Sequence, residues 1–273
     1  MTSQFDGLAD DYARMAPEHP VRAYVERHTL LATLGDVHGT RALDLGCGAG
    51  MYTRLLRERG AVDVTGTDVS EGMLEIARRR ERADGLGVRY LRRDATRADD
   101  PVDSALDGAF ELVVSVYALP YAATEEELTT MCRTARRALG PSGGRLVAVT
   151  LEPEISTEPG YYDAYGFEVA ALADADGAAA DGAPIRVTLR WADTVIPLDV
   201  RRWSARTIER ALRRAGFDTV ERVRPRVSDE GRQRFGDSYW RDYLNRPHLL
   251  ILDCAAGPTA HRTTDPGLGA PAP

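Results

Sequence analysis

The stretch Arg41-Ala42-Leu43-Asp44-Leu45-Gly46-Cys47-Gly48-Ala49-Gly50-Met51-Tyr52-Thr53 decides the fold of this 273-residue chain. A short apolar run carries an acid near its end, three glycines follow at alternate positions, and a helix is expected to start next. Alternating glycines let the backbone turn sharply and approach a ligand without an intervening Cβ. The first amides of the following helix are unpaired donors. A loop of this kind after a first strand is how doubly wound sheets hold nucleotide-like molecules.

Apolar runs downstream predict the rest of a sheet. Further buried strands are expected at residues 62–68, 88–91, 110–116 and 145–151. Helices are expected between them, after Gly50, after a Ser70 cap and over residues 125–139. Because successive strands joined by helices form parallel sheets with right-handed crossovers, the pattern predicts a doubly wound α/β fold.

Two segments depart from this alternation. Residues 5–34 predict two helices broken at Pro17 and Pro20, which we assign to a helical cap, residues 1–35. Within residues 152–203, strand-like runs at 167–172, 185–191 and 194–203 predict a small antiparallel insertion that serves as a lid.

After the insertion the first pattern resumes. We expect a Ser204-capped helix ending at Gly216, a strand at 219–223, a loop with Phe235, Tyr239 and Trp240, and a last strand at 248–254. We therefore expect one domain over residues 1–256. The remainder, residues 257–273, is Gly-, Pro-, Ala- and Thr-rich and predicts a disordered tail.

Composition narrows the function. All 35 basic residues are Arg, and the absence of Lys excludes Schiff-base chemistry and a P-loop lysine. A formal net charge of -7 disfavours nucleic acid as a partner. Cys47, Cys132 and Cys254 are too widely spaced to suggest a metal site or a disulfide framework. Without a signal peptide or a long apolar span, we expect a cytoplasmic protein that does not bind membranes, with a small-molecule substrate and at most a second copy as partner.

Acids close the first three expected strands, at Asp44, Asp68 and Asp94. The carboxyl ends of parallel strands meet at one edge of a sheet, so the three should lie close together. A carboxylate after the second strand can accept hydrogen bonds from both hydroxyls of a ribose. One after the third could accept from an adenine amino group. We interpret the three acids as a nucleoside site, because a packing role explains them poorly.

Residues 36–256 resemble the class I S-adenosylmethionine-dependent methyltransferases. The resemblance is carried by Leu43–Gly50, Thr67–Leu74, Arg93–Ala95 and the strand at 110–116, and the end of the chain resembles the family's, where the last strand of a seven-stranded sheet inserts antiparallel. It implies S-adenosylmethionine as cofactor. The implied contacts are the backbone of Gly46, Cys47 and Gly48 with the methionine portion, Asp68 with the ribose, Val69, Met73, Asp94 and Ala95 with the adenine, and the Ser115 carbonyl with the methionine amino group, and Asp44 is a further cofactor-binding candidate.

The N-terminal cap has two interpretations. The pattern alone favours helices that merely cover a sheet edge. However, Phe5–Tyr12 resembles the N-terminal segment of small-molecule methyltransferases, whose tyrosine folds over the cofactor. That resemblance implies cofactor contacts for Tyr12 and, with it, Arg22.

Aromatic residues are the expected acceptor site, since flat rings suit a heterocycle and tolerate a cationic sulfur. The substrate-binding candidates are Tyr117, Tyr121, Tyr161, Tyr165, Tyr239 and Trp240, and we expect about half of such aromatics to pack the lid instead. Tyr117, Tyr121 and Glu152 are the catalytic candidates, with Glu152 as a base or orienting group. His19, His28 and His248 are interpreted as surface or structural residues. Alignment of the reactants can supply about 7–11 kcal/mol, so a base is optional.

A narrower resemblance concerns the acceptor. Tyr121-Ala122, Glu126–Leu128, Tyr165–Phe167 and Phe235–Trp240 look like the toxoflavin-type N-methyltransferases. This implies methylation of a ring nitrogen in a bicyclic heterocycle, in a specialised pathway such as antibiotic biosynthesis. A ring N–H of that class ionises readily, which agrees with a missing base.

Two other functions stay open. One is O-methylation of a phenolic or polyketide metabolite, which would normally want a His or Asp base. The other is a cofactor-binding protein without catalysis. Nucleic-acid methylation is disfavoured by the charge and by Ala118-Leu119-Pro120-Tyr121, which differs from an Asn/Asp-Pro-Pro-Tyr motif.

Overall fold

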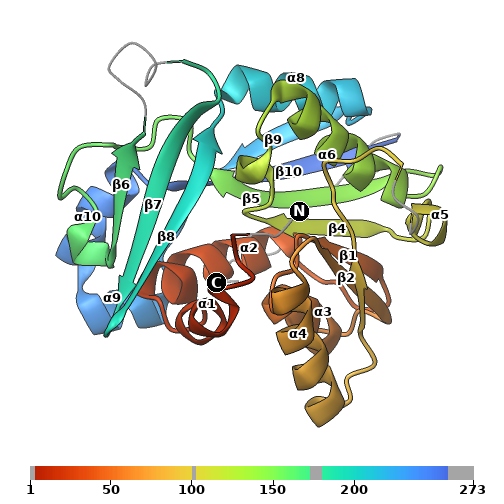
Figure 1. The fold of residues 1–273 in the computed structure, drawn as a ribbon, viewed down its shortest axis with the longest axis horizontal. Coiled ribbons are helices and arrows are strands. Elements are labelled where there is room, and N and C mark those ends of the chain that lie inside the picture. Colours follow the sequence, from red (N-terminus) through yellow and green to blue (C-terminus); the bar gives the residue numbers. More distant parts are fainter. Residues whose placement is uncertain (1–3, 100–102, 173–179, 258–273) are drawn as a thin grey trace, which may run out of the picture.

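A seven-stranded sheet forms the centre of the computed structural model, which describes residues 4–99, 103–172 and 180–257 (Figure 1). Its strand order is β3-β2-β1-β4-β5-β10-β9. The strands are β1 Arg41–Leu45, β2 Asp63–Asp68, β3 Arg89–Arg92, β4 Leu112–Val116, β5 Gly144–Leu151, β9 Thr219–Val223 and β10 Leu249–Ala256. The first five are parallel, whereas β10 is antiparallel to both β5 and β9. The predicted fold class is therefore confirmed, including the inserted last strand.

Helices cover both faces of this sheet (Figure 1). Those on one face are α2 Arg27–Leu34, α3 Met51–Glu58 and α4 Glu71–Asp84, and those on the other are α6 Glu125–Ala138 and α8 Ala205–Ala215. A short helix, α5 Asp103–Leu106, precedes β4. Because both faces are covered, the central strands are almost continuously apolar and buried. The predicted caps are confirmed: Ser70 and Ser204 each accept a hydrogen bond, at 3.2 Å, from the amide three residues on.

The predicted antiparallel insertion is also confirmed, as a separate three-stranded sheet in the order β6-β7-β8. Its strands are β6 Phe167–Ala171, β7 Ala183–Trp191 and β8 Thr194–Arg202. Strand β8 contacts the N-terminal helix α1 (Ala9–Met15) and the 3₁₀ turn η2 (Leu119–Tyr121) that follows β4. The small sheet thus stands beside the edge at which the central parallel strands end (Figure 1).

The structure corrects two local expectations. The expected loop around Phe235 to Trp240 consists of two short helices, α9 Asp229–Phe235 and α10 Asp237–Asn245, separated at Gly236 with φ +81°. The glycine breaks the apolar period, which hid both helices from the sequence pattern. The second cap helix opens with a π-helical turn, η1 Arg22–Glu26, a distortion that is frequent at functional sites. A further 3₁₀ turn, η3 Asp163–Tyr165, precedes β6.

The predicted tail falls on residues 258–273, outside the described residues, apart from Gly257. Across the described ranges, no helix is both long and apolar enough to cross a membrane.

Candidate active site

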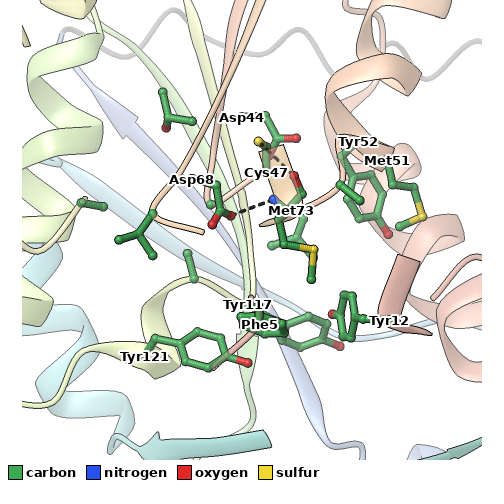
Figure 2. A pocket seen from close by; sticks show the side chains of 18 of the residues that line it. Phe5, Tyr12, Asp44, Cys47, Met51, Tyr52, Asp68, Met73, Tyr117 and Tyr121 are labelled. Carbon is green, nitrogen blue, oxygen red and sulfur yellow. Dashed lines mark hydrogen bonds between the residues drawn. The ribbon is translucent and has the colours of Figure 1, made fainter. Parts of the chain in front are cut away.

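A first cavity opens beyond the carboxyl ends of β1, β2 and β4 and encloses about 1250 Å³, its mouth included (Figure 2). It is lined by every residue that the sequence predicted for the cofactor except Ser115. These residues are Tyr12, Arg22, Asp44, Gly46, Cys47, Gly48, Asp68, Val69, Met73, Asp94 and Ala95. The Ser115 hydroxyl donates to the Leu45 carbonyl at 3.0 Å, inside the sheet, and the contact predicted for the Ser115 carbonyl stays a prediction. The sheet edge therefore brings together residues that lie far apart in the chain.

The glycine loop after β1 is shaped by contacts with its neighbours. Gly46 has φ +79°, and a Cβ placed there would lie 2.6 Å from the Cβ of Ala118. The amides of Gly46 and Cys47 donate to the Thr67 carbonyl at 2.8 and 2.9 Å. The Gly48 amide donates to Asp68 Oδ2 at 2.8 Å. Because these three amides are already paired, this part of the loop offers a ligand carbonyl oxygens, which suit an ammonium group.

Asp68, at the end of β2, is oriented from both sides, and Figure 2 shows one of the two hydrogen bonds. Its Oδ2 accepts from the Gly48 amide, and its Oδ1 accepts from the Ser70 amide at 2.8 Å. Burial raises the pKa of Asp68, while these backbone hydrogen bonds oppose that rise. A carboxylate has about four lone-pair sites, so two remain for a ligand such as a ribose diol.

Asp44 lies deeper in the same cavity and is 1% exposed. Its Oδ2 accepts a hydrogen bond from the Thr53 hydroxyl at 2.7 Å. Burial raises the pKa of Asp44 to about 7, with a smaller contribution from the charge of Asp68. Its charge therefore responds to any cation that enters the cavity near neutral pH.

The turn after β3 forms another wall of the first cavity. Asp94 and Ala95 line it, together with Arg93 and Thr96. Asp94 Oδ1 accepts from the Thr96 amide at 3.0 Å and from the Thr96 hydroxyl at 2.6 Å. These bonds fix the turn at the position where the sequence predicted an adenine contact.

The N-terminal cap contributes a buried cation. The Arg22 guanidinium donates to the Tyr12 hydroxyl at 2.8 Å and to Glu26 Oε1 at 3.3 Å. It also lies 5.5 Å from the ring centroid of Tyr12 and 5.8 Å from that of Tyr117. Burial opposes the charge of Arg22, but the neighbouring Glu26 carboxylate and tyrosine hydroxyls raise its pKa overall. Tyr12 and Arg22 are thus cavity residues, and the cap does more than cover the sheet edge.

A second cavity of about 550 Å³ lies between the turn after β4 and the small antiparallel sheet. Its walls are largely apolar. They comprise Tyr12, His19, Arg22, Tyr117, Pro120, Tyr121, Leu151, Phe167, Val187, Leu189, Leu198, Val200 and His248. Four of these residues, Tyr12, Arg22, Tyr117 and Tyr121, also line the first cavity, so the two cavities meet there. Among the residues that the structure describes, no Asp or Glu lines the second cavity.

Tyr117 is held at this junction in a strained conformation. Its backbone φ is +56°, a value that residues other than glycine rarely adopt. Its hydroxyl lies 2.9 Å from Nε2 of His248, and the two rings are stacked. Strain of this kind accumulates where function demands a particular side-chain position.

Of the surface and structural interpretations, the structure excludes the surface one for two histidines. His19 is 2% exposed and His248 is 8% exposed, and both line the second cavity. Burial lowers the pKa of His19 to about 4 and that of His248 to about 3. The position of His248 could have been predicted from the inserted last strand. Because β10 runs antiparallel to β5, the residues at its start lie at the edge where the parallel strands end.

Glu152 does not reach either cavity. Its carboxylate accepts from the Arg222 guanidinium at 2.7 Å, an ion pair formed on the neighbouring edge strand β9. The expectation that Glu152 supplies a base or orients a substrate is corrected, because its side chain turns away from the junction of the cavities.

Four of the six aromatic substrate candidates also lie elsewhere. The hydroxyls of Tyr161, Tyr165 and Tyr239 donate to the carbonyls of Asp242, Tyr239 and Ala164, and the Trp240 indole donates to Gly231. These bonds and ring contacts join α10 to η3 and to α9. These four aromatics therefore hold η3, α9 and α10 together, whereas Tyr117 and Tyr121 line both cavities.

Known proteins resemble the chain in sequence. Residues 42–143 match a family model described as a methyltransferase domain. An N-demethylindolmycin N-methyltransferase from Streptomyces griseus is 28% identical over 229 residues, 81% of this chain and 90% of that enzyme. A demethylmenaquinone methyltransferase from Thermus thermophilus is 38% identical over 115 residues, 41% of this chain and 48% of that enzyme. The chain spans about half or less of several other curated relatives that it matches.

A solved structure resembles the whole fold. The crystal structure of an S-adenosylmethionine-dependent methyltransferase from Mesorhizobium loti superposes with a TM-score of 0.61 at 29% identity. The match covers 84% of this chain and 97% of that protein, so it extends well beyond the matched family domain.

Proposed function

We infer that this chain, which is a class I S-adenosylmethionine-dependent methyltransferase, methylates a ring nitrogen of a small heterocyclic metabolite. S-adenosylmethionine is its methyl donor, and when bound it supplies a methyl group already activated by the sulfonium. What remains for the protein is to align a nucleophile with that methyl group and to exclude water.

The residues of the first cavity fit this donor. The lone pairs left on Asp68 suit the ribose hydroxyls, and the turn at Asp94 and Ala95 suits the adenine. We assign the ammonium of the methionine portion to the loop carbonyls after Gly46, and its carboxylate to the Arg22 guanidinium. A guanidinium has five N–H donors, and the described hydrogen bonds of Arg22 use two of its nitrogens.

The junction of the two cavities is the observation that carries the proposal. The second cavity meets the first at Tyr12, Arg22, Tyr117 and Tyr121, so an acceptor in the second would face the donor in the first. Its apolar walls suit a flat ring. Without a carboxylate in its described lining, and with Arg22 at its edge, it has no partner for a protonated amine. A neutral or ionised ring nitrogen is therefore favoured over an aliphatic amine.

Base catalysis contributes little in this proposal. With Glu152 paired to Arg222, the basic groups that line the second cavity are His19 and His248. Burial lowers the pKa of both imidazoles below 5, which makes them weak proton acceptors. A heterocyclic N–H that loses its proton readily suits such a site. The similarity to an N-demethylindolmycin N-methyltransferase supports N-methylation and a role in antibiotic biosynthesis.

O-methylation of a phenolic metabolite is the second candidate, because two imidazoles do line the second cavity. It would require one of them to take a hydroxyl proton despite its lowered pKa. The product distinguishes the two functions, since an N-methyl and an O-methyl group differ in mass fragmentation and carbon chemical shift.

A substrate screen tests the proposal. The full chain is incubated with S-adenosylmethionine and panels of N–H heterocycles, phenols and aliphatic amines, and S-adenosylhomocysteine formation is measured. We expect turnover with heterocycles and its loss in Val187→Phe, which fills the second cavity. Turnover confined to phenols would establish the second candidate. Cofactor binding without turnover of any class would indicate a cofactor-binding protein.

A further inference from the structure

The buried ring of His248 connects two tyrosines from different elements. Its Nε2 lies 2.9 Å from the hydroxyl of Tyr117, and its Nδ1 lies 2.9 Å from the hydroxyl of Tyr243 on α10. Burial, with smaller contributions from the charges of His19 and Arg22, lowers the pKa of His248, so the ring is neutral at physiological pH. A neutral imidazole has one N–H donor and one bare nitrogen. The two tyrosines therefore receive opposite roles.

Tyr243 decides which nitrogen carries the proton. Its side chain is completely buried, and within the described chain its hydroxyl has no hydrogen-bond partner except His248. A buried hydroxyl proton that has no acceptor costs more free energy than a buried oxygen lone pair that has no donor. Oxygen atoms that accept fewer hydrogen bonds than they could are common in proteins. Tyr243 therefore donates to Nδ1. The imidazole proton then resides on Nε2 and is donated to the oxygen of Tyr117.

Because His248 donates to the Tyr117 oxygen, the hydroxyl proton of Tyr117 is not used in the hydrogen bond with His248. Tyr117 lines both cavities at their junction, and its backbone strain keeps the ring there. Burial raises the pKa of Tyr117, and the charge of Glu26 and a side-chain hydrogen bond to that carboxylate raise it further, so the hydroxyl remains protonated. It is a donor at the junction where the acceptor atom and the methyl group meet.

We propose that the Tyr117 hydroxyl, oriented by the positioning residues His248 and Tyr243, donates a hydrogen bond to a lone-pair atom of the methyl acceptor. The inference rests on the proposed function, because it assumes that the acceptor occupies the second cavity. The lone pair belongs to a carbonyl oxygen or ring nitrogen beside the methylated atom, since a hydrogen bond to the nucleophilic lone pair would block the transfer. The acceptor class is thus a flat heterocycle with a ring N–H next to such an atom.

The same hydrogen bond assists the reaction. A carbonyl flanking a ring nitrogen takes up negative charge when that nitrogen loses its proton, and a donor on the carbonyl stabilises this charge. Inside the protein the Tyr117 hydroxyl has a competing recipient in Glu26, a buried carboxylate that interacts with it and whose Oε2 accepts no other hydrogen bond among the described residues. If Tyr117 donated to Glu26 when an acceptor is bound, ligands with and without a lone pair would respond equally to removal of the hydroxyl.

Isosteric probes test the proposal without turnover. Naphthalene, quinoline and isoquinoline share one bicyclic shape, and the last two replace one C–H by a lone-pair nitrogen. Each is titrated by fluorescence into the full chain saturated with S-adenosylhomocysteine. We expect Tyr117→Phe to weaken at least one of the nitrogen probes by roughly two- to tenfold while naphthalene is unchanged. His248→Phe and Tyr243→Phe should reduce the same difference, because they release the hydroxyl of Tyr117.

Tyr162→Phe is the matched control. Tyr162 is a buried tyrosine whose ring contacts His248, but its hydroxyl donates to the Arg246 carbonyl. Its removal should leave the preference for the nitrogen probes intact. Equal responses of naphthalene and both nitrogen probes to Tyr117→Phe would overturn the hydrogen bond and leave the proposed function standing. Failure of every probe to bind, or binding that survives Val187→Phe, would overturn the assignment of the second cavity to the acceptor.

Discussion

Replacement of Asp68 by alanine tests the ribose assignment most directly. Two of its lone-pair sites accept backbone amides at 2.8 Å, which leaves two for the hydroxyls of a nucleoside. Hydrogen bonds to a charged group contribute about 1.5–3 kcal/mol each. Loss of two at the lower end costs about 3 kcal/mol, or roughly a 150-fold weaker cofactor affinity. Solvation of the free carboxylate lowers this figure, so at least a tenfold loss is expected.

Calorimetric titration of S-adenosylhomocysteine into Asp68→Ala measures this loss. Asp63→Ala is the matched control, because Asp63 begins the same strand and its carboxylate pairs with exposed Arg89, away from the first cavity. Adenosine and 2′,3′-dideoxyadenosine locate the effect. Wild type should distinguish the two nucleosides, whereas the variant should bind them with equal, weak affinity. An unchanged affinity in a folded variant, or a variant that still distinguishes them, would refute the assignment.

The other predictions concern Asp44, Gly46 in the glycine loop, Glu152 and the C-terminal residues 258–273. Because the pKa of Asp44 is about 7 in the free protein and a cationic ligand favours its charged form, S-adenosylmethionine should release protons on binding and bind more tightly as the pH rises through 7. Calorimetry in buffers of different ionisation enthalpy would show this, and proton uptake, or release that persists in Asp44→Asn, would contradict it. Gly46→Ala should weaken cofactor binding at least tenfold and lower stability by about 1–3 kcal/mol, since its Cβ would lie 2.6 Å from that of Ala118; wild-type affinity and melting temperature would argue against that clash. Glu152→Gln should retain turnover within about twofold, because catalysis here leaves Glu152 unused; a loss of kcat alone would restore it as a base. Deletion of residues 258–273 should leave turnover intact, and an inactive but folded truncated enzyme would assign the tail to the site.

Much of the fold was predictable because local patterns and the global topology agree. The apolar runs that became β1, β4 and β5 are buried on both faces, so they read as strands without knowledge of their neighbours. Helices α9 and α10 could not be predicted in this way. Each is short, Gly236 interrupts their period, and Trp240 and Tyr243 are buried by contacts with distant segments.

The donor side of the site was more predictable than the acceptor side for a related reason. Asp44, Asp68 and Asp94 lie at or just beyond the carboxyl ends of β1, β2 and β3, and parallel strands bring these ends to one edge whatever the rest of the chain does. The acceptor side depends on which face of a lid each aromatic presents. Sequence cannot distinguish Tyr121, which lines both cavities, from Tyr165, which supports α10.

The sequence by itself determined a glycine loop after a first strand, acids at the next two strand ends and, through the order of its strands, a doubly wound sheet. These features are local in the chain, and the geometry of parallel strands determines where they lie in the folded protein. Only the tertiary structure decided that Arg22 and Tyr12 reach the junction of two cavities, that Glu152 turns toward Arg222, and that His248 lies between Tyr117 and Tyr243. These are contacts between residues far apart in sequence, and their geometry depends on how the cap, the inserted strand and the lid pack together.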